Sequence, residues 1–333
     1  MVPADGAGER PDPGRGLSPA FRVSRSLVVV NPASAGGRTL RRWPGIERAL
    51  SRAGIDHTAQ LTLGPGDATT LTREAILSRG IRRVVAVGGD GTLNEVVNGC
   101  FDGGCTPLAD GLTVGLIPSG TGGDFRHALG LPSDPEAAAR LLAGGSTRVV
   151  DIGRVSFADG SVRHFINIAD CGIGGEVASR VNRRRHRGGG LVGTAVFLGV
   201  SVATMLTFRG RDLLLSFDGE TIHRKVQQVV VANGTHFGGG MRMAPDAKPD
   251  DGLFDVIIVA DISRLGSIRA VPRLYRGTHL ALPVVEVRRA RSIDIAAAPG
   301  EEPPLFDVDG EQVGRVPAQI TICPGALRFA SPP

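Results

Sequence analysis

Residues 84–99 read Val-Val-Ala-Val-Gly-Gly-Asp-Gly-Thr-Leu-Asn-Glu-Val-Val-Asn-Gly, and this stretch decides the fold of the first half of the chain. The β-branched run at 84–87 predicts a buried strand, and Leu93, Val96 and Val97 follow at the spacing of a helix. A strand, a glycine-rich turn and a helix start point main-chain N–H groups at an anion. The stretch therefore predicts a phosphate-binding loop, because a glycine puts no Cβ in the path of the phosphate.

Asp90 is the unusual residue of this loop. A carboxylate repels a bare phosphate, so its presence indicates a divalent cation that bridges the carboxylate and the phosphate. The loop therefore predicts a site for a metal–nucleoside triphosphate. The alternative is an ordinary turn between a strand and a helix.

Two further polar, glycine-rich loops follow predicted strands. A strand at 26–30 leads into Asn-Pro-Ala-Ser-Ala-Gly-Gly-Arg at 31–38, and a strand at 112–117 leads into Pro-Ser-Gly-Thr-Gly-Gly-Asp-Phe at 118–125. Loops after parallel strands gather at one edge of an open α/β sheet, which is where such sheets bind their ligands.

The remaining elements of the first half alternate between strand and helix. The pattern predicts helices at 40–53 and 67–77 and a strand at 57–63, with Asp67 as the N-cap of the second helix. This alternation predicts an α/β domain with a parallel sheet.

After about residue 146 the pattern changes to short strands. Asp218-Gly219-Glu220 lies between two of them and predicts a hairpin. The predicted strands are 212–217, 221–231, 254–259, 284–288, 292–295 and 319–323. This half is therefore predicted to be a mainly antiparallel sandwich or barrel.

The length of 333 residues suits two domains. We expect a disordered tail at 1–22, an α/β domain at 23–145 and a β-sandwich domain at 146–333 whose last segment could return to the first. The net charge of +5 suits an anionic ligand or an anionic membrane surface. Aromatic residues make up only 4%, which argues against nucleic acid as a partner.

Two features bear on the cellular context. The four cysteines, at 100, 105, 171 and 323, show no metal-ligand spacing, so we expect free thiols in a reducing compartment. The uncharged stretch 191–208 is short for a membrane span and rich in Gly, Ser and Thr, which favours a helix packed between two β layers. The arginine-rich run at 183–187 precedes it and suits a peripheral contact with anionic lipid.

Taken together, the motifs resemble the diacylglycerol kinase catalytic family, the lipid kinases that include sphingosine and ceramide kinases. The resemblance covers about residues 25–330 and rests on five motifs in order: 31–34, 88–94 with its continuation to 99, 120–125, 245–253 and 309–311. It implies an NAD kinase/phosphofructokinase-like α/β domain followed by a β-sandwich. Two residues depart from the family pattern: Ala35 stands where glycine is usual, and Gly123 stands where asparagine is usual.

The resemblance implies ATP and Mg²⁺ as cofactors. The implied ATP-binding residues are Asn31, Pro32, Ser34, Ala35, Thr62, Gly88, Gly89, Asp90, Gly91, Thr92, Leu93, Asn94, Thr121 and Asp124. Asp90 would act through Mg²⁺, and the alternative for Asp124 is a helix N-cap. Lys248, Asp251 and Leu253 would hold a second Mg²⁺ through one carboxylate and two main-chain carbonyls, oxygen ligands that Mg²⁺ accepts.

The implied activity is transfer of the γ-phosphate of ATP to a hydroxyl of diacylglycerol or a related lipid alcohol. Glu311 and Asp309 are the candidates for the base that takes the acceptor's proton, and two residues apart on a strand they would share a face. We place Glu311 first. Two alternatives stay open: a catalytically silent homologue that binds nucleotide or lipid, and a soluble-substrate kinase of the NAD type. We expect a cytoplasmic location, and a homodimer is one alternative for the oligomeric state.

Overall fold

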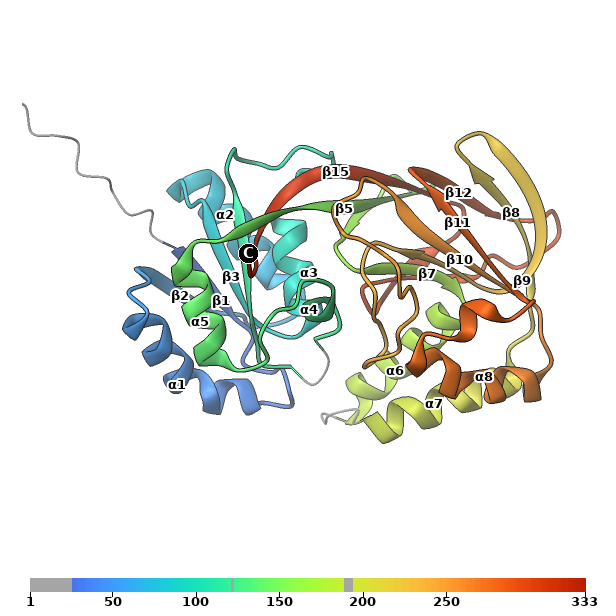
Figure 1. Ribbon diagram of the computed structural model, residues 1–333, viewed down its shortest axis with the longest axis horizontal. Coiled ribbons are helices and arrows are strands. Elements are labelled where there is room, and N and C mark those ends of the chain that lie inside the picture. Colours follow the sequence, from blue (N-terminus) through green and yellow to red (C-terminus); the bar gives the residue numbers. More distant parts are fainter. Residues whose placement is uncertain (1–25, 121–122, 189–193) are drawn as a thin grey trace, which may run out of the picture.

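A parallel sheet covered by helices on both faces forms the first half of the molecule (Figure 1). The computed structural model describes residues 26–120, 123–188 and 194–333, so the tail predicted at 1–22 lies outside the described residues. The elements of this half are β1 (Ser26–Val30), α1 (Arg38–Arg52), β2 (His57–Leu61), α2 (Asp67–Arg79), β3 (Arg83–Gly88), α3 (Asp90–Gly99), β4 (Thr113–Pro118), α4 (Phe125–Ala128) and α5 (Pro135–Gly144).

The strands of this sheet run in the order β2-β1-β3-β4, all parallel. Alternate residues of β1 enter two different cores, as the period of a strand requires. Val28 and Val30 pack with residues of α1 and α5, whereas Leu27 and Val29 pack with residues of α2 and α3. The carboxyl ends of β1, β3 and β4 therefore lie at one edge, and the three polar loops follow them there.

The second half is mainly antiparallel. Its strands are β5 (Thr147–Phe157), β6 (Val162–Phe165), β7 (Ile168–Gly172), β8 (Arg211–Phe217), β9 (Glu220–Ala232), β10 (Phe254–Ala260), β11 (Val285–Ala290), β12 (Ser292–Ala297), β13 (Leu305–Val308), β14 (Glu311–Arg315) and β15 (Ala318–Ala330). Its helices are α6 (Ile173–Gly188), α7 (Thr194–Thr207), α8 (Arg264–Arg276) and the short 3₁₀ helix η1 (His279–Ala281). The predicted fold class, a parallel α/β half followed by an antiparallel β-sandwich half, is confirmed.

The last strand joins the two halves. β15 pairs antiparallel with β5 along most of its length, and its end pairs parallel with β4, where Phe329 lies opposite Val114. One sheet therefore continues from the first half into the second (Figure 1).

The uncharged stretch does not pack between β layers. Its helix, α7, contacts α6 and α8, and Figure 1 shows these three helices together on one side of the second half. The small residues of α7 allow this helix-on-helix packing, and Val200 joins a small core with Val177 and Val181. Residues 191–193 of the stretch, and the side chains of residues 184–187, lie outside the described part of the chain. Within the described part, no helix is long and apolar enough to cross a membrane.

The prediction of free thiols is wrong for two of the four cysteines. Cys105 and Cys323 form a disulfide across 218 residues, whereas Cys100 and Cys171 are free and buried. The fold brings the loop after α3 against β15, and sequence spacing carries no sign of that approach. The N-cap prediction for Asp67 is also wrong. Gly66 is the N-cap, and the Asp67 carboxylate instead accepts from the N–H of Leu63.

Candidate active site

The glycine loop after β3 packs against the loop after β4. A Cβ on Gly120 would lie 2.7 Å from Cα of Gly89, and a Cβ on Gly88 would lie 2.4 Å from Oγ1 of Thr92. Such contacts exclude any side chain, so these glycines serve the close approach of two backbones. α3 begins at Asp90, which points the start of the helix at the same edge of the sheet.

The Asp90 carboxylate binds the backbone of the third loop. Its Oδ2 accepts from the N–H groups of Gly123 (2.8 Å) and Asp124 (3.1 Å), and Oδ1 accepts from Phe125 (3.4 Å). A carboxylate in a phosphate loop therefore has a second explanation besides a bridging cation. It orders the neighbouring loop by charge-assisted hydrogen bonds.

Asp124 connects this loop to the sandwich half. Its two carboxylate oxygens accept from the N–H groups of Gly239 and Gly240, both at 2.8 Å. Burial, followed by the nearby charge of Asp90, raises the pKa of Asp124 to about 6. The alternative that Asp124 caps a helix is wrong, because α4 begins after it without a side-chain cap hydrogen bond.

The backbone at Gly123 explains its departure from the family pattern. Its φ of 90° lies in the left-handed region, which glycine adopts freely and asparagine tolerates better than most residues. The backbone at this position therefore suits glycine, and a Cβ there would also lie 3.2 Å from Cδ of Arg126. The neighbouring Thr121, a predicted ATP-binding residue, lies outside the described residues.

The first loop is held to the other two by side chains. Asn31 donates from Nδ2 to Oγ1 of Thr92 (3.0 Å) and accepts at Oδ1 from the N–H of Ala33 (3.0 Å). Thr39, at the start of α1, donates to Oγ of Ser119 at 2.8 Å and also lies within hydrogen-bonding distance of the Ser34 hydroxyl. The three predicted loops therefore form one connected surface.

Two more predicted ATP-binding residues lie at this edge. Ala35 is buried and has a φ of 52°, a left-handed conformation that favours the glycine usual in the family. Thr62 follows β2 and is buried, and its N–H donates to the carbonyl of Val30 at the end of β1. The structure thus places both beside the first loop.

Asn94 points toward the second half of the molecule. Its Nδ2 donates to Oδ2 of Asp309 (2.8 Å) and to the carbonyl of His164 (2.9 Å). Asn98 binds the main chain of His164 through both of its amide atoms. The helix that follows the glycine loop is therefore fastened to β6, a connection that sequence reasoning missed.

Asp309 is enclosed by hydrogen-bond donors. Besides Asn94, its carboxylate accepts from the N–H groups of Ile166 (3.1 Å), Asn167 (3.1 Å) and Ile168 (3.0 Å). Burial raises its pKa to about 6. Its φ of 49° places it in the turn before β14 rather than on a strand, so it does not share a strand face with Glu311.

Glu311 lies at the glycine loop. A Cβ built on Gly91 would lie 3.4 Å from Oε1 of Glu311, and the Glu311 side chain is exposed. The turn that Asp309 anchors thus brings a carboxylate from far along the chain to the predicted phosphate site. Asp309 lies behind it.

The turn at 245–253 carries the predicted second metal site. Oδ1 of Asp251 accepts from the N–H of Leu253 (3.2 Å), and Oδ2 is ion-paired with Arg289. Asp151, which sequence reasoning missed, accepts from the N–H of Gly252 at 2.7 Å. Burial raises the pKa of Asp151, and the charges of Asp251 and Asp250 raise it further.

This chemistry fits an oxygen-ligated cation, which would relieve the repulsion between these carboxylates. Among the described residues, no three His, Cys, Asp or Glu side chains form a metal-binding group. A cation here would therefore depend on main-chain carbonyls, as the assignment of Lys248 and Leu253 requires. The only signal for Asp151 in the sequence is a lone carboxylate within an apolar run.

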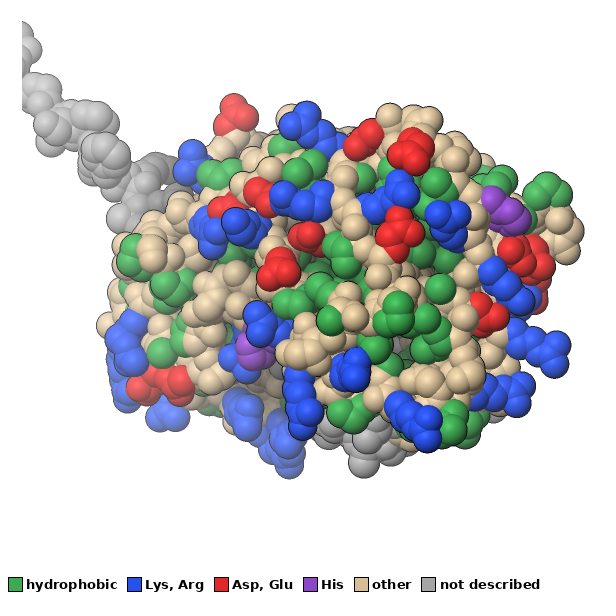
Figure 2. Space-filling model, turned by 45° about the vertical axis from the view of Figure 1, so that its right-hand side comes forward, with side chains coloured by type: hydrophobic (Ala, Val, Ile, Leu, Met, Phe, Trp, Pro, Cys, Tyr) green, Lys and Arg blue, Asp and Glu red, His purple; other side chains and the backbone are tan. Residues whose placement is uncertain are grey.

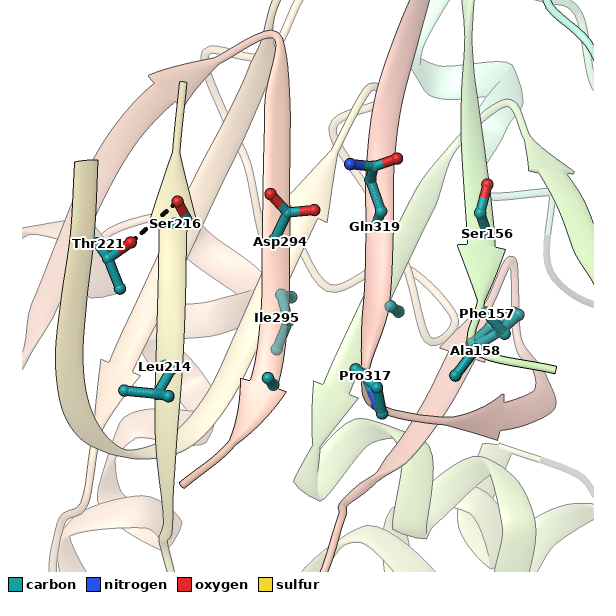
Figure 3. A pocket seen from close by; sticks show the side chains of 12 residues that line it. Ser156, Phe157, Ala158, Leu214, Ser216, Thr221, Asp294, Ile295, Pro317 and Gln319 are labelled. Atoms are coloured by element: carbon teal, nitrogen blue, oxygen red, sulfur yellow. Dashed lines mark hydrogen bonds between the residues drawn. The ribbon is translucent and has the colours of Figure 1, made fainter. Parts of the chain in front are cut away.

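Two cavities lie away from these loops. An open groove of about 400 Å³ follows the strands of the sandwich, with Asp294, Gln319 and Ser156 on one side and the hydrogen-bonded pair Thr221 and Ser216 on another (Figure 3). It contains none of the predicted site residues. A smaller cavity of about 60 Å³ lies between α7, α8 and β9 and is mainly apolar.

The structure thus places glycine loops at the carboxyl edge of a parallel sheet, with the carboxylate of Glu311 against one of them. The diacylglycerol kinase catalytic domain model matches residues 25–155, and the model of the YegS C-terminal NAD kinase beta sandwich-like domain matches residues 167–331. The diacylglycerol kinase of Staphylococcus haemolyticus (strain JCSC1435) is 33% identical over 295 residues, which cover 88% of this chain and 84% of that one. The chain belongs to the diacylglycerol kinase family.

Other relatives agree with this assignment. The diacylglycerol kinase of Bacillus subtilis (strain 168) is 28% identical over 299 residues, which cover 90% of this chain and 93% of that one. A solved structure of a Bacillus anthracis str. Sterne protein, provisionally assigned as a diacylglycerol kinase, superposes with a TM-score of 0.73 at 25% identity. The superposition covers 94% of this chain and 99% of that one, so the likeness extends over both halves.

Proposed function

We propose that the protein transfers the γ-phosphate of ATP to a hydroxyl of diacylglycerol or a closely related lipid alcohol. The observation that carries this proposal is the position of Glu311 against Gly91 of the glycine loop. In this proposal the acceptor hydroxyl would meet the terminal phosphate beside this carboxylate. The names of the curated relatives support diacylglycerol as the acceptor class.

The nucleotide would bind along the surface formed by the three loops. The N–H groups at the start of α3 and of the glycine loops would hold the phosphate oxygens, as helix N-termini do. Asn31, Thr92 and Asp90 keep these loops in register through the hydrogen bonds described above. Phosphoryl transfer needs chiefly positioning and charge stabilisation, and a rigid set of loops supplies positioning.

Glu311 would act as the general base. It would take the proton of the acceptor hydroxyl while that oxygen attacks the γ-phosphorus and the bond to the ADP oxygen breaks. Asp309 is assigned as the positioning residue behind it, because its carboxylate is enclosed by four donors and holds the turn in place.

We propose two places for Mg²⁺. Asp90, whose carboxylate also accepts N–H bonds from the third loop, would hold the ion that accompanies ATP, and this ion would neutralise phosphate charge when bound. Lys248, Asp251 and Leu253 would hold a second ion that stabilises the turn beside Asp151.

Base catalysis is tested by the amide variants Glu311→Gln and Asp309→Asn. We expect Glu311→Gln to lower kcat by roughly 100- to 10,000-fold with little change in the KM for ATP, because the base faces the acceptor. Glu220→Gln is the matched control, since Asp218-Gly219-Glu220 has the same tripeptide in an exposed hairpin. Full turnover in Glu311→Gln would contradict the assignment of the base.

We also propose peripheral contact with an anionic membrane. The exposed arginines of α8 (Arg264, Arg269, Arg273 and Arg276) support it, as does the absence of acidic residues from that helix. Exposed Leu265 lies among them, and Figure 2 shows Lys and Arg side chains gathered along the lower edge of the molecule. Charges of this kind contribute about 1 kcal/mol each near an anionic surface.

The membrane proposal is tested by flotation with vesicles. Arg269→Glu/Arg273→Glu should release the protein from phosphatidylglycerol vesicles, and so should high salt. The matched control is Arg41→Glu/Arg48→Glu on the exposed face of α1, which should stay bound. Equal binding of both variants would contradict the assignment of this surface.

The comparisons favour the kinase over the catalytically silent alternative, because the curated relatives are named as kinases. Gly123, one of the two departures from the family pattern, has a left-handed backbone that suits glycine. The soluble-substrate alternative is supported by no observation beyond the shared fold.

A further inference from the structure

Two aspartates face each other inside the sandwich half, directly behind the turn that carries Glu311. Asp170 on β7 and Asp307 on β13 are register partners in an antiparallel pair. Their side chains are buried, with 1% and 3% of the residue exposed. Oδ1 of Asp170 and Oδ2 of Asp307 each have no hydrogen-bond partner among the described residues.

The remaining oxygens of the pair bind main-chain and amide donors. Oδ1 of Asp307 accepts from the N–H of Gly310 at 3.0 Å, which closes the turn immediately before Glu311. The Asp170 carboxylate accepts from the N–H of Gly175, in the first turn of α6, and from the side chain of Gln228 on β9.

The chain is built to fit this carboxylate closely. A Cβ on Gly174 would lie 2.1 Å from Oδ1 of Asp170, and a Cβ on Gly175 would lie 2.4 Å from the carbonyl oxygen of Leu305. Only glycines allow α6 to begin against β7 and β13 in this way. The orphaned oxygen of Asp170 therefore has no room for an additional group on the α6 side.

Two carboxylates side by side in a buried site cannot both ionise, and a proton between them would give each orphaned oxygen a partner. We propose that Asp170 and Asp307 share one proton, held between Oδ1 of the first and Oδ2 of the second, and that this acid pair positions the turn that carries Glu311. The positioning role rests on the proposed function of Glu311, whereas the shared proton does not.

The surroundings favour the protonated form. Burial raises the pKa of Asp170 to about 7; burial and then the charge of Asp170 raise the pKa of Asp307 well above its usual range. Asp309 and Glu311 face Asp307 from the turn and add negative charge. The Cys171 thiol lies beside Asp170, and burial raises its pKa as well. Among the described residues, the groups that shift these two pKa values most include no cation.

The shared proton is tested by the pH dependence of unfolding, which needs no activity. The full chain would be unfolded in urea at pH 6, 7 and 8 as wild type, Asp307→Asn and Asp170→Asn. The folded pair holds a proton that the unfolded aspartates lack at these pH values, so unfolding releases this proton. The equilibrium constant for unfolding therefore rises tenfold for each unit by which the pH increases. In either amide variant, the unfolding constant should depend less on pH than in wild type, by up to a factor of ten per pH unit.

The matched control is Asp294→Asn, an exposed aspartate on β12. It should keep the wild-type slope. Equal slopes in wild type and in both pair variants would overturn the proposal. If one pair variant fails to fold, the other still decides it.

The positioning role is tested by rescue. In Asp307→Asn the amide oxygen still accepts from Gly310 and the amide nitrogen donates to Asp170, so kcat should stay within a few-fold of wild type. Asp307→Leu removes both bonds, and we expect kcat to fall at least tenfold with the KM for ATP unchanged. Equal losses in Asn and Leu would overturn the positioning role. The pair variants could lose the pH dependence of unfolding while Glu311→Gln keeps full turnover. That result would support the shared proton and contradict the assignment of Glu311 as the base.

Discussion

The Cys105–Cys323 disulfide should contribute strongly to stability, since it closes a loop across 218 residues. In the chain-entropy model such a loop lowers the free energy of the folded state relative to the unfolded chain by about 5 kcal/mol. The bond joins the loop after α3 to β15. Reduction should therefore have two effects. It should give the unfolded chain more conformational freedom, and it should weaken the contact between the two halves of the folded molecule.

The measured loss should be smaller than this limit. Arg154 Nε donates to the carbonyl of Gly103 (2.6 Å), and a ring nitrogen of His164 lies 2.8 Å from the carbonyl of Gly104. These bonds keep the loop beside β5 and β6 after reduction. We therefore expect Cys105→Ser to lower the free energy of unfolding by about 2–4 kcal/mol, the usual range for a native disulfide.

Urea unfolding would be followed by far-UV circular dichroism and by the fluorescence of Trp43, the single tryptophan, which belongs to α1 and is buried. Wild type should lose stability in dithiothreitol and then match Cys105→Ser, whereas the variant should not respond to dithiothreitol. Cys105 is exposed, so the reductant can reach the bond. Alkylation of both thiols only after reduction would show that the reductant breaks the bond. Equal stability of wild type with and without reductant under those conditions would refute the reasoning.

Three further predictions concern the loops. Ala35→Gly should raise the free energy of unfolding by about 0.5–1 kcal/mol, measured in urea, because it relieves a left-handed alanine at φ 52°. Asn94→Ala should lower kcat and also destabilise the protein by about 1–3 kcal/mol, since it removes a buried amide that donates to the carboxylate of Asp309. Thermal unfolding and kinetics measured side by side check this. Asp124 has a folded pKa of about 6 against an unfolded value near 3.8, so wild type should gain about 1 kcal/mol over Asp124→Asn between pH 7 and pH 5. A constant difference between those two proteins would contradict it.

The first half of the fold could be predicted because local and global signals agree there. β1 and β3 are β-branched apolar runs that lead into polar, glycine-containing loops, and a helix follows each loop. The strands that sequence reasoning missed are short or carry polar residues inward. β7 contains buried Asp170, and its neighbours in the sheet come from β9 and β13, far along the chain. No local period marks such a strand, because its partners decide its burial.

The candidate site shows the same division. The glycine loops could be predicted from the sequence, since close backbone approach requires glycine wherever it occurs. The hydrogen-bond partners of the polar side chains could not be predicted. Asp90 was predicted to face a cation, and its carboxylate binds the third loop; Asn94 was predicted to face ATP, and its amide binds Asp309. Residue type shows that a polar group needs a partner, but only the fold shows which partner it has.

The two Asp-Gly-Glu tripeptides make this point within one chain. Asp218 and Asp309 both adopt left-handed backbone, with φ of 47° and 49°, and each precedes a glycine of positive φ. The local turns are therefore alike, as two identical sequences in hairpins should be. Asp218 accepts one bond, from the N–H of Ser292, and remains exposed, whereas Asp309 is partly buried and its carboxylate accepts from four donors. The difference comes from α3 and β7, which surround the second turn and place its glutamate at the glycine loop. The chemistry proposed for Glu311 thus depends on the packing of the two halves against each other, and the same tripeptide placed in another hairpin would lack it.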